Sequence, residues 1–351
     1  MKPVVALFFG GRSPEHDVSV VSARGIVEHL DRSRWELVLV GIDRRGAAWA
    51  GGEEMLEADV GTRGTRVRLP SDPQDRCLRE AVGGEPCSPP LDVIFPVIHG
   101  WGGEDGKLQG LAAWAGIPCV GAGVLGSALA MDKDRARRLL AAEGLPVVRD
   151  AVFSGEQARD AEAIARAVED LGWPLFVKPA RSGSSVGISR VDGPEALAGA
   201  IAEAGHWDGK IVLEAAVNDP REIEIAVLGH REPEVSVAGE IEPHGAFYDY
   251  RAKYEDAESK LIIPAPLPGE VLRELRSYAV RAFVALELQG MARVDFLLER
   301  STGKIVLNEV NTVPGFTPIS MYPRLWQASG LDFSALLDRL LELATDGAEG
   351  H

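Results

Sequence analysis

Hydrophobic runs separated by glycine, proline and charged residues divide the first third of the chain into alternating elements. Apolar runs that are typical of buried strands occupy residues 4–9, 35–42, 91–98 and 117–121. Helical spacing of apolar positions occupies residues 18–30 and 108–115. Strands that alternate with helices favour a doubly wound, parallel sheet, so this region is predicted to be an α/β domain. Residues 51–90 are rich in Gly, Pro and charge, and we interpret them as irregular connections.

The rest of the chain has more strands for each helix. Helical spacing occupies residues 127–143, 158–171 and 270–288. Strand-like runs occupy residues 175–179, 210–214, 223–228, 235–241, 261–263, 292–298 and 305–309. A new unit is expected to begin at Pro146, and strands recur from residue 217 onwards.

Polar and apolar side chains alternate in the segments 291–298 and 305–311. Successive side chains of a strand point to opposite faces, so Arg293 and Asp295 share one face, and so do Glu309 and Asn311. The two segments together predict an antiparallel pair. Oxygen ligands beside a guanidinium suit Mg²⁺ with a bound phosphate, because Mg²⁺ prefers oxygen donors and completes its shell with water and phosphate. The alternative is a half-exposed sheet with ordinary polar outer faces.

A Gly/Ser-rich loop, residues 181–187, follows the predicted strand that carries Lys178. Glycines let backbone N–H groups approach an anion, hydroxyls add donors and a lysine supplies charge, so the loop is suited to hold phosphate. Its spacing is not that of a P-loop. A flexible surface turn is the alternative, because Gly/Ser clusters usually mark loops.

Two glycine-rich loops follow strands of the first domain, where binding loops of a parallel sheet lie. The loop of residues 99–106 contains His99 and Glu104, and its glycines indicate a sharp bend or a close approach of the backbone to a ligand. The loop of residues 10–19 carries Glu15 near a helix start. Glu15 is either a binding carboxylate or an ordinary acid in the first turn of a helix.

The segment 247–254 is rich in tyrosine and charge and includes Lys253 and Tyr254. Such a segment suits a loop that closes over a site. The alternative is an ordered surface loop with packed tyrosines.

Composition narrows the class of protein. The net charge of −16 over 351 residues argues against general binding to nucleic acid or anionic membranes. The apolar run near the N-terminus is too short for a signal peptide or a membrane span. The three cysteines have neither metal-ligand spacing nor an even count, which favours a reducing cytoplasm.

In their order along the chain, these segments resemble the D-alanine–D-alanine ligases of the ATP-grasp superfamily. The resemblance covers nearly the whole chain, in GGRSPEHDVS (10–19), HGWGGEDG (99–106), MDK (131–133), FVKPARSGSSVGIS (176–189), LE and REIE (213–224), FYDYRAKY (247–254), MARVDF (291–296) and NEVNTVPGFTPISMYP (308–323). Any one of these segments is weak evidence, whereas the ordered set is highly specific.

The resemblance implies an α/β (α+β ATP-grasp) fold. A doubly wound parallel domain is expected over residues 1–128, followed by two ATP-grasp subdomains over residues 129–216 and 217–351. The implied reaction joins two D-alanines through D-alanyl phosphate, with ATP converted to ADP and phosphate, for peptidoglycan precursor synthesis. ATP and two Mg²⁺ or Mn²⁺ ions are the implied cofactors. A cytoplasmic homodimer without nucleic-acid or membrane partners is also implied.

The family pattern assigns a role to individual residues of this chain. Glu15 would bind the ammonium of the first D-alanine, and Ser320 the carboxylate of the second. Implied catalytic residues are Glu15, Ser184, Tyr254, Arg293 and Gly315. Implied substrate-binding residues are His99, Lys253, Ser320 and Met321. Implied ATP-binding residues are Lys133, Lys178, Ser185, Glu214, Ala215, Val217 and Glu222. Implied metal ligands are Asp295, Glu309 and Asn311.

Three alternatives remain open. A D-alanine–D-lactate or D-alanine–D-serine ligase would use the same scaffold, and Tyr254 argues against the lactate version. The N-terminal loops disfavour an ATP-grasp ligase that joins other amino acids, and the intact set around Arg293 disfavours a non-catalytic nucleotide-binding protein. Ser182 and Arg251 stand where the family often has acidic residues.

Overall fold

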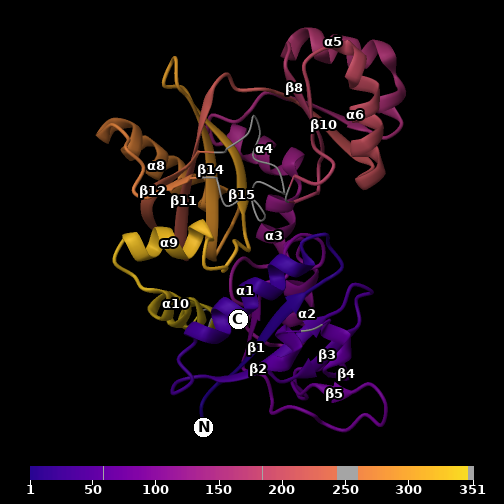
Figure 1. Ribbon diagram of the computed structural model, residues 1–351, viewed down its shortest axis with the longest axis vertical. Coiled ribbons are helices and arrows are strands. Elements are labelled where there is room, and N and C mark those ends of the chain that lie inside the picture. The colour runs from indigo at the N-terminus through magenta and orange to yellow at the C-terminus, as the bar shows by residue number, and fades with distance from the viewer. Residues whose placement is uncertain (58, 184, 243–259, 347–351) are drawn as a thin grey trace.

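The structure, a computed structural model, describes residues 1–57, 59–183, 185–242 and 260–346. Over these ranges it contains three sheets, of six, four and five strands. Figure 1 shows the first sheet at the bottom, the second at the upper right beside α5 (Ala161–Leu171) and α6 (Pro194–Trp207), and the third at the upper left. The predicted α/β fold is therefore confirmed.

The first sheet has the order β5-β4-β3-β2-β1-β6. Its strands are β1 (Val4–Gly10), β2 (Glu36–Ile42), β3 (Ala48–Gly51), β4 (Thr65–Arg68), β5 (Arg79–Glu80) and β6 (Val93–Pro96). β1 is parallel to β2 and β6, as predicted, whereas β3, β4 and β5 continue the sheet in antiparallel pairs. The loops that leave β1 and β6 consequently emerge at the same edge of the sheet.

Two predictions for the first sheet are wrong. The segment 51–90 is not only irregular, because it contains β4, β5 and two 3₁₀ turns. The predicted strand over residues 117–121 is reduced to an isolated bridge between Ile94 and Cys119. Pro118 explains this reduction, since proline has no N–H to donate to a ladder.

The helix predicted over residues 127–143 is two helices. α3 (Val124–Met131) and α4 (Lys133–Ala142) are separated at Asp132, whose backbone is extended. The Asp132 side chain accepts a hydrogen bond of 3.2 Å from the backbone N–H of Arg135 and thereby caps α4. The remaining helices of the first region are α1 (His16–His29) and α2 (Lys107–Trp114).

The second sheet is antiparallel and has the order β7-β10-β8-β9. Its strands are β7 (Asp150–Ser154), β8 (Leu175–Pro179), β9 (Ser189–Val191) and β10 (Lys210–Ala215). The Gly/Ser-rich loop 181–187 joins β8 to β9, so it follows a strand as predicted.

The third sheet is also antiparallel, in the order β13-β12-β11-β14-β15. Its strands are β11 (Pro220–Gly229), β12 (Glu234–Glu242), β13 (Lys260–Ile262), β14 (Gly290–Glu299) and β15 (Ile305–Asn311). The predicted antiparallel pair of β14 and β15 is confirmed, with Asp295 opposite Glu309 and Arg293 opposite Asn311. The side chains that alternate with the polar ones, including Val294 and Phe296, are buried as predicted.

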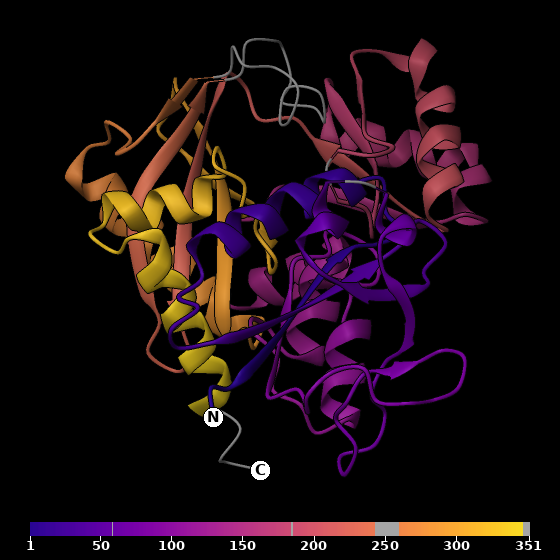
Figure 2. The same ribbon diagram turned by 60° about the horizontal axis from the view of Figure 1, so that its bottom comes forward.

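Helices cover both faces of the third sheet. α8 (Gly269–Ala285) packs against one face, and α9 (Met321–Ala328) and α10 (Phe333–Asp346) contribute to a core on the other. The core beneath α9 and α10 also includes Phe9 and Phe95 of the first sheet. The first and third sheets therefore share one hydrophobic cluster. Figure 2 shows α10, in yellow, beside the N-terminal strands, in indigo, and α9 over the third sheet. The predicted domain boundaries after residues 128 and 216 stay predictions.

No helix in the described ranges is long and apolar enough to cross a membrane.

Candidate active site

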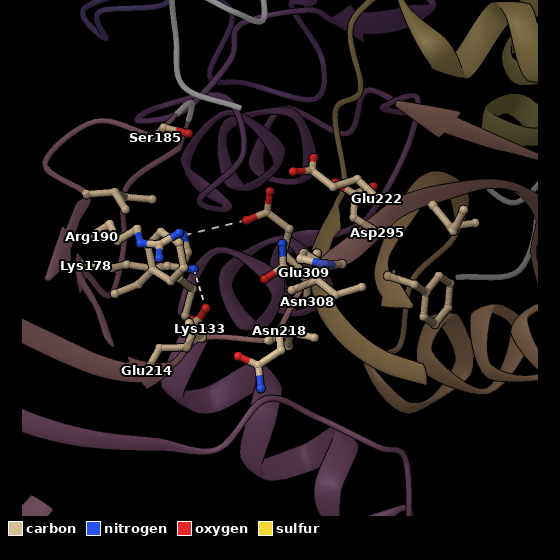
Figure 3. Close-up of a pocket in the computed structure, with 18 of the residues that line it drawn as sticks. Lys133, Lys178, Ser185, Arg190, Glu214, Asn218, Glu222, Asp295, Asn308 and Glu309 are labelled. Carbon is tan, nitrogen blue, oxygen red and sulfur yellow. Dashed lines mark hydrogen bonds and ion pairs between the residues drawn. The ribbon is translucent and has the colours of Figure 1, made fainter. Parts of the chain in front are cut away.

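A cavity of about 660 Å³ lies between the second and third sheets. Lys133, Lys178 and Glu214 line it on one side, and Glu222, Asp295 and Glu309 line it on the other. Figure 3 shows Lys133 and Lys178 directed toward the side on which Glu309 and Asp295 lie. The sequence-predicted residues that line the cavity are Lys133, Lys178, Ser185, Glu214, Val217, Glu222, Asp295 and Glu309. Segments far apart in the sequence therefore contribute opposite charges to one space.

The predicted metal ligands meet where β14 pairs with β15. Asp295 and Glu309 are register partners, and the side-chain amide of Asn311 donates a hydrogen bond of 2.9 Å to Asp295 Oδ2. No cluster of three or more His, Cys, Asp or Glu side chains suited to a metal occurs among the described residues. A divalent cation would thus rely on two carboxylates, one amide oxygen, water and phosphate oxygens. This all-oxygen set fits Mg²⁺.

Arg293 lies between two carboxylates. Its guanidinium donates to both oxygens of Asp295, at 2.8 and 2.7 Å, and lies 3.0 Å from Glu224 Oε2. Burial alone would lower the pKa of Arg293, but the charges of Asp295 and Glu224 outweigh it and raise the pKa. Arg293 is therefore a fixed positive charge that is held against Asp295 and Glu224, which line the cavity.

Sequence reasoning missed Glu224. It lies opposite Asp295 on the neighbouring strand β11 and is buried. The signal was present, because Glu222 and Glu224 are two residues apart and share a face of the strand.

Glu214 is the acceptor of two cationic side chains. Lys178 Nζ donates to Glu214 Oε1 at 2.6 Å, and Arg137 donates to the other oxygen. Burial alone would raise the pKa of Glu214, but the charges of Arg137 and Lys178 hold the pKa at about 2. Glu214 is consequently an ionised carboxylate that only accepts hydrogen bonds.

Arg137 is a second residue that sequence reasoning missed. It is buried, and it also bonds Asp150 at 2.9 Å, so it ties α4 to β7 and β10. Its position four residues after Lys133 places both side chains on one face of α4. That spacing was the available signal.

Lys133 joins the loop 181–187 to the acidic strands. Its Nζ donates to the carbonyl of Ser182 at 2.6 Å and lies 4.0 Å from Glu309 Oε2. Burial lowers the pKa of Lys133, and this effect exceeds the opposing charge of Glu309. Ser185 lines the cavity from the same loop, with a φ of 59°.

The predicted adenine-binding stretch only partly faces the cavity. Ala215 pairs with Leu175 in the second sheet and packs against the core of that sheet. The N–H of Ala215 donates a hydrogen bond to the backbone carbonyl of Arg149. Ala216 and Val217 line the cavity directly after it. Glu222 lines the cavity from β11.

A second group of predicted residues surrounds Glu15 and His99, which are both buried. His99 Nδ1 donates to the Val313 carbonyl at 3.0 Å and lies 3.7 Å from Glu104 Oε1. Burial alone would lower the pKa of His99, but Glu104 and the charge of Glu15 raise it. A negatively charged, enclosed corner of this kind suits an ammonium group.

Glu15 connects this corner to the cavity. A Cβ added at Gly100 or at Gly183 would lie 2.9 Å from Glu15 Oε2. The Glu15 carboxylate therefore lies against both the loop 99–106 and the loop 181–187. Glycine at these positions leaves room for it.

The loop after β15 approaches the same corner. Ser320 Oγ accepts a hydrogen bond of 3.0 Å from Thr317 N–H, and a Cβ added at Gly315 would lie 2.6 Å from that Oγ. Phe316 N–H donates to Ser22 Oγ at 3.2 Å. The Met321 side chain is buried in the hydrophobic core, so only its backbone is available to a ligand.

Three predicted site residues lie outside the described ranges. They are Ser184, Lys253 and Tyr254.

Two known protein families match this chain, and together they cover most of it. The "D-ala D-ala ligase N-terminus" family matches residues 4–122, and the "D-ala D-ala ligase C-terminus" family matches residues 139–342. The two matches together cover the loops that meet at Glu15 and the strands that line the cavity.

Relatives and solved structures agree with these matches. The D-alanine–D-alanine ligase of Thermoanaerobacter sp. (strain X514) is 47% identical over 98% of this chain and 97% of its own, and that of Streptomyces avermitilis is 45% identical over 99% and 96%. The VanG D-Ala:D-Ser ligase from Enterococcus faecalis has a TM-score of 0.87 at 36% identity, covering 98% of this chain and 100% of its own. The D-alanine-D-alanine ligase from Coxiella burnetii has a TM-score of 0.87 at 34% identity, covering 99% and 95%. The chain belongs to the D-alanine–D-alanine ligase family.

Proposed function

We propose that this protein ligates two D-alanines to D-alanyl-D-alanine with ATP and supplies a peptidoglycan precursor. The observation that carries the proposal is the meeting of two sites at Gly183. On one side lies a cavity lined by lysines and carboxylates, and on the other lies the buried carboxylate of Glu15. A nucleotide phosphate and an amino acid can then be held side by side.

The nucleotide would lie in the cavity. Lys133, Lys178 and Ser185 line the cavity and would contact its phosphates. Glu214 would accept a hydrogen bond from the adenine amine, because an ionised carboxylate is an acceptor only. The backbone of residues 215–217 would complete adenine recognition, and Glu222 would bind the ribose.

Asp295, Glu309 and Asn311 would hold the divalent cations, which we propose to be two Mg²⁺ or Mn²⁺ ions. When bound, such ions neutralise the charge of the transferred phosphoryl group. The lysines on the opposite side of the cavity add positive charge to the same group. Water must be excluded, because it would hydrolyse an acyl phosphate.

The first D-alanine would place its ammonium at Glu15, near His99. Its carboxylate attacks the terminal phosphorus of ATP, and D-alanyl phosphate and ADP result. The neutral amine of the second D-alanine then attacks the acyl carbon, and phosphate leaves. Arg293 and the Gly315 N–H would stabilise the oxyanion of that step, and removal of one such donor typically costs about 3 kcal/mol.

The second D-alanine would be held by the Ser320 hydroxyl and the Met321 backbone. Ser184, Lys253 and Tyr254 are proposed to complete the site from outside the described ranges. The predicted closing loop, residues 247–254, also lies outside the described ranges.

The cellular setting is also part of the proposal. We expect a cytoplasmic homodimer, as the family resemblance implies. We expect it to act on small molecules, because the acidic chain does not favour nucleic acid or anionic membranes as partners. Residues 1–128, 129–216 and 217–351 are its proposed domains.

A D-alanine–D-serine ligase is the second candidate. The solved D-Ala:D-Ser ligase has the same TM-score, 0.87, as the D-alanine-D-alanine ligase from Coxiella burnetii, so the fold suits either second substrate. The side chains of D-alanine and D-serine differ by one hydroxyl, which an apolar pocket rejects weakly.

ADP release tests the proposal. The protein with Mg-ATP should release ADP rapidly when D-alanine is added and slowly when it is not. ATP turnover that is independent of D-amino acids, or no turnover at all, would contradict a ligase. Turnover that needs both D-alanine and D-serine would favour the second candidate.

A further inference from the structure

Trp101 connects two loops that belong to different sheets. It lies two residues after His99, in the loop 99–106. Its indole N–H donates a hydrogen bond of 2.8 Å to the carbonyl of Arg181, the first residue of the loop 181–187. Its ring centroid lies 6.1 Å from that of Trp207, at the end of α6, with an interplanar angle of 32°. The roles assigned above do not use Trp101.

The loop 181–187, which accepts the Trp101 hydrogen bond, also contacts Lys133 and Trp207. Lys133 Nζ holds the carbonyl of Ser182 at 2.6 Å. Trp207 lies against the far end of the loop, where a Cβ added at Gly187 would be 2.6 Å from Trp207 Cδ1. Trp101 thus bonds the start of the loop and packs on the residue that supports its end. An indole suits this task, because it combines a large apolar ring with one N–H donor.

The other side of the Trp101 loop borders the amino-acid corner. Gly100 precedes Trp101, and a Cβ added there would lie 2.9 Å from Glu15 Oε2, the same distance as from a Cβ added at Gly183. The Glu15 carboxylate therefore lies between the two loops that Trp101 joins. A shift of either loop changes the space around Glu15.

We propose that Trp101 is a positioning residue that couples nucleotide binding to D-alanine binding. The identity of the two ligands rests on the proposed function. Nucleotide phosphates fix the loop 181–187, the fixed loop holds Trp101, and Trp101 holds the loop 99–106 around the ammonium at Glu15. By linkage, D-alanine then tightens nucleotide binding by the same factor by which nucleotide tightens D-alanine binding.

Calorimetric titration measures this coupling without turnover. The native protein is titrated with a magnesium complex of a non-hydrolysable ATP analogue, with and without saturating D-alanine. The ratio of the two Kd values is the coupling factor, and we expect about 5-fold or more. Trp101→Ala should bring the factor close to one. Trp101→Phe keeps a ring but removes the N–H, so its factor should be intermediate.

Two further variants separate coupling from folding. Trp114→Phe is the matched control, because Trp114 is 75% exposed on α2, and it should keep the native factor. Trp207→Leu removes the ring partner and leaves the Trp101 N–H bond available, so it should reduce the factor. In the Trp101→Phe/Trp207→Leu double variant the two effects should be non-additive, because the residues are in contact.

The outcomes distinguish the two proposals. A purely structural Trp101 would lower the melting temperature and leave the coupling factor native, which overturns the positioning role. A native coupling factor of one overturns it as well. If Trp101→Ala does not fold, the other two variants decide. A native coupling factor in both Trp101→Phe and Trp207→Leu would also overturn the positioning role. A native protein that binds no nucleotide analogue contradicts the proposed function and the coupling together.

Discussion

Glu309 is the residue at which the predicted metal ligands meet the lysines that we propose to bind phosphate. Its carboxylate lies opposite Asp295 and 4.0 Å from Lys133 Nζ. Glu309→Gln removes the charge and keeps the volume, so D-alanine-dependent ATP turnover should fall by about 100-fold or more, as for other losses of transition-state electrostatics. The melting temperature should stay close to native. Initial rates and thermal unfolding provide the two measurements.

Glu270→Gln is the control for this change, because the Glu270 side chain is 92% exposed on α8. It should leave both quantities unchanged. Full ATP turnover by Glu309→Gln would contradict the assignment of Glu309 as a metal ligand.

His99 provides a prediction for pH. Its folded pKa is raised above the ordinary value of 6.5 by Glu104 and Glu15, which outweigh burial. Its contribution to stability is therefore fully present below the unfolded pKa and is lost as pH rises through the folded pKa. Glu104→Gln should lower the pKa of His99, and it should destabilise the protein more at pH about 6 than at pH about 9.

NMR titration of the His99 imidazole and urea unfolding at the two pH values are the measurements. An imidazole that titrates at the native pKa in Glu104→Gln would show that Glu104 does not set its charge.

At the scale of elements, α4 is tied to the second sheet by a buried charge network. Arg137 bonds Asp150 on β7 and Glu214 on β10. Arg137→Met leaves Glu214 with one of its two cationic partners, and breaking a buried pair typically costs about 3–5 kcal/mol in the free energy of unfolding. The pKa of Glu214 should rise from about 2, so stability should also be lost at a higher pH on acidification.

Arg138→Met is a matched control, because Arg138 is the next residue of α4 and its side chain is 68% exposed. Urea unfolding of both variants tests the network. Equal destabilisation by the two changes would mean that the buried pair does not contribute as described.

Periodicity decides which elements are readable from the sequence. The alternation in β14 and β15 gave the faces of Arg293, Asp295, Glu309 and Asn311 before the structure, because one face of each strand is buried. α6 was not predicted, since its run of alanine and glycine gives little contrast between faces. The break at Asp132 within MDK was missed because a capping residue inside a helical pattern resembles an ordinary polar position.

Contacts between distant segments had no local signal. The approach of Glu15 to Gly183 and the bond from Arg137 to Glu214 join residues 168 and 77 positions apart. Only the folded arrangement of the sheets brings them together. The resemblance supplied Glu15, Glu214 and Lys178, but not Arg137, the second cation at Glu214.

At the scale of the whole molecule, the first and third sheets share one hydrophobic cluster. The family resemblance further implies a homodimer. Sedimentation equilibrium should therefore give a mass of two 37.6 kDa chains. A single-chain mass at micromolar concentration would contradict the homodimer and leave the ligase assignment intact.

The proposed product of the protein is D-alanyl-D-alanine. Mass spectrometry of products formed from Mg-ATP with equal D-alanine, D-serine and D-lactate tests it most directly, at pH about 6 and about 8, because an amine attacks only when neutral. We expect D-alanyl-D-alanine as the main product at both pH values, with a higher yield at the higher pH. D-Alanyl-D-serine or D-alanyl-D-lactate as the main product at both values would contradict it.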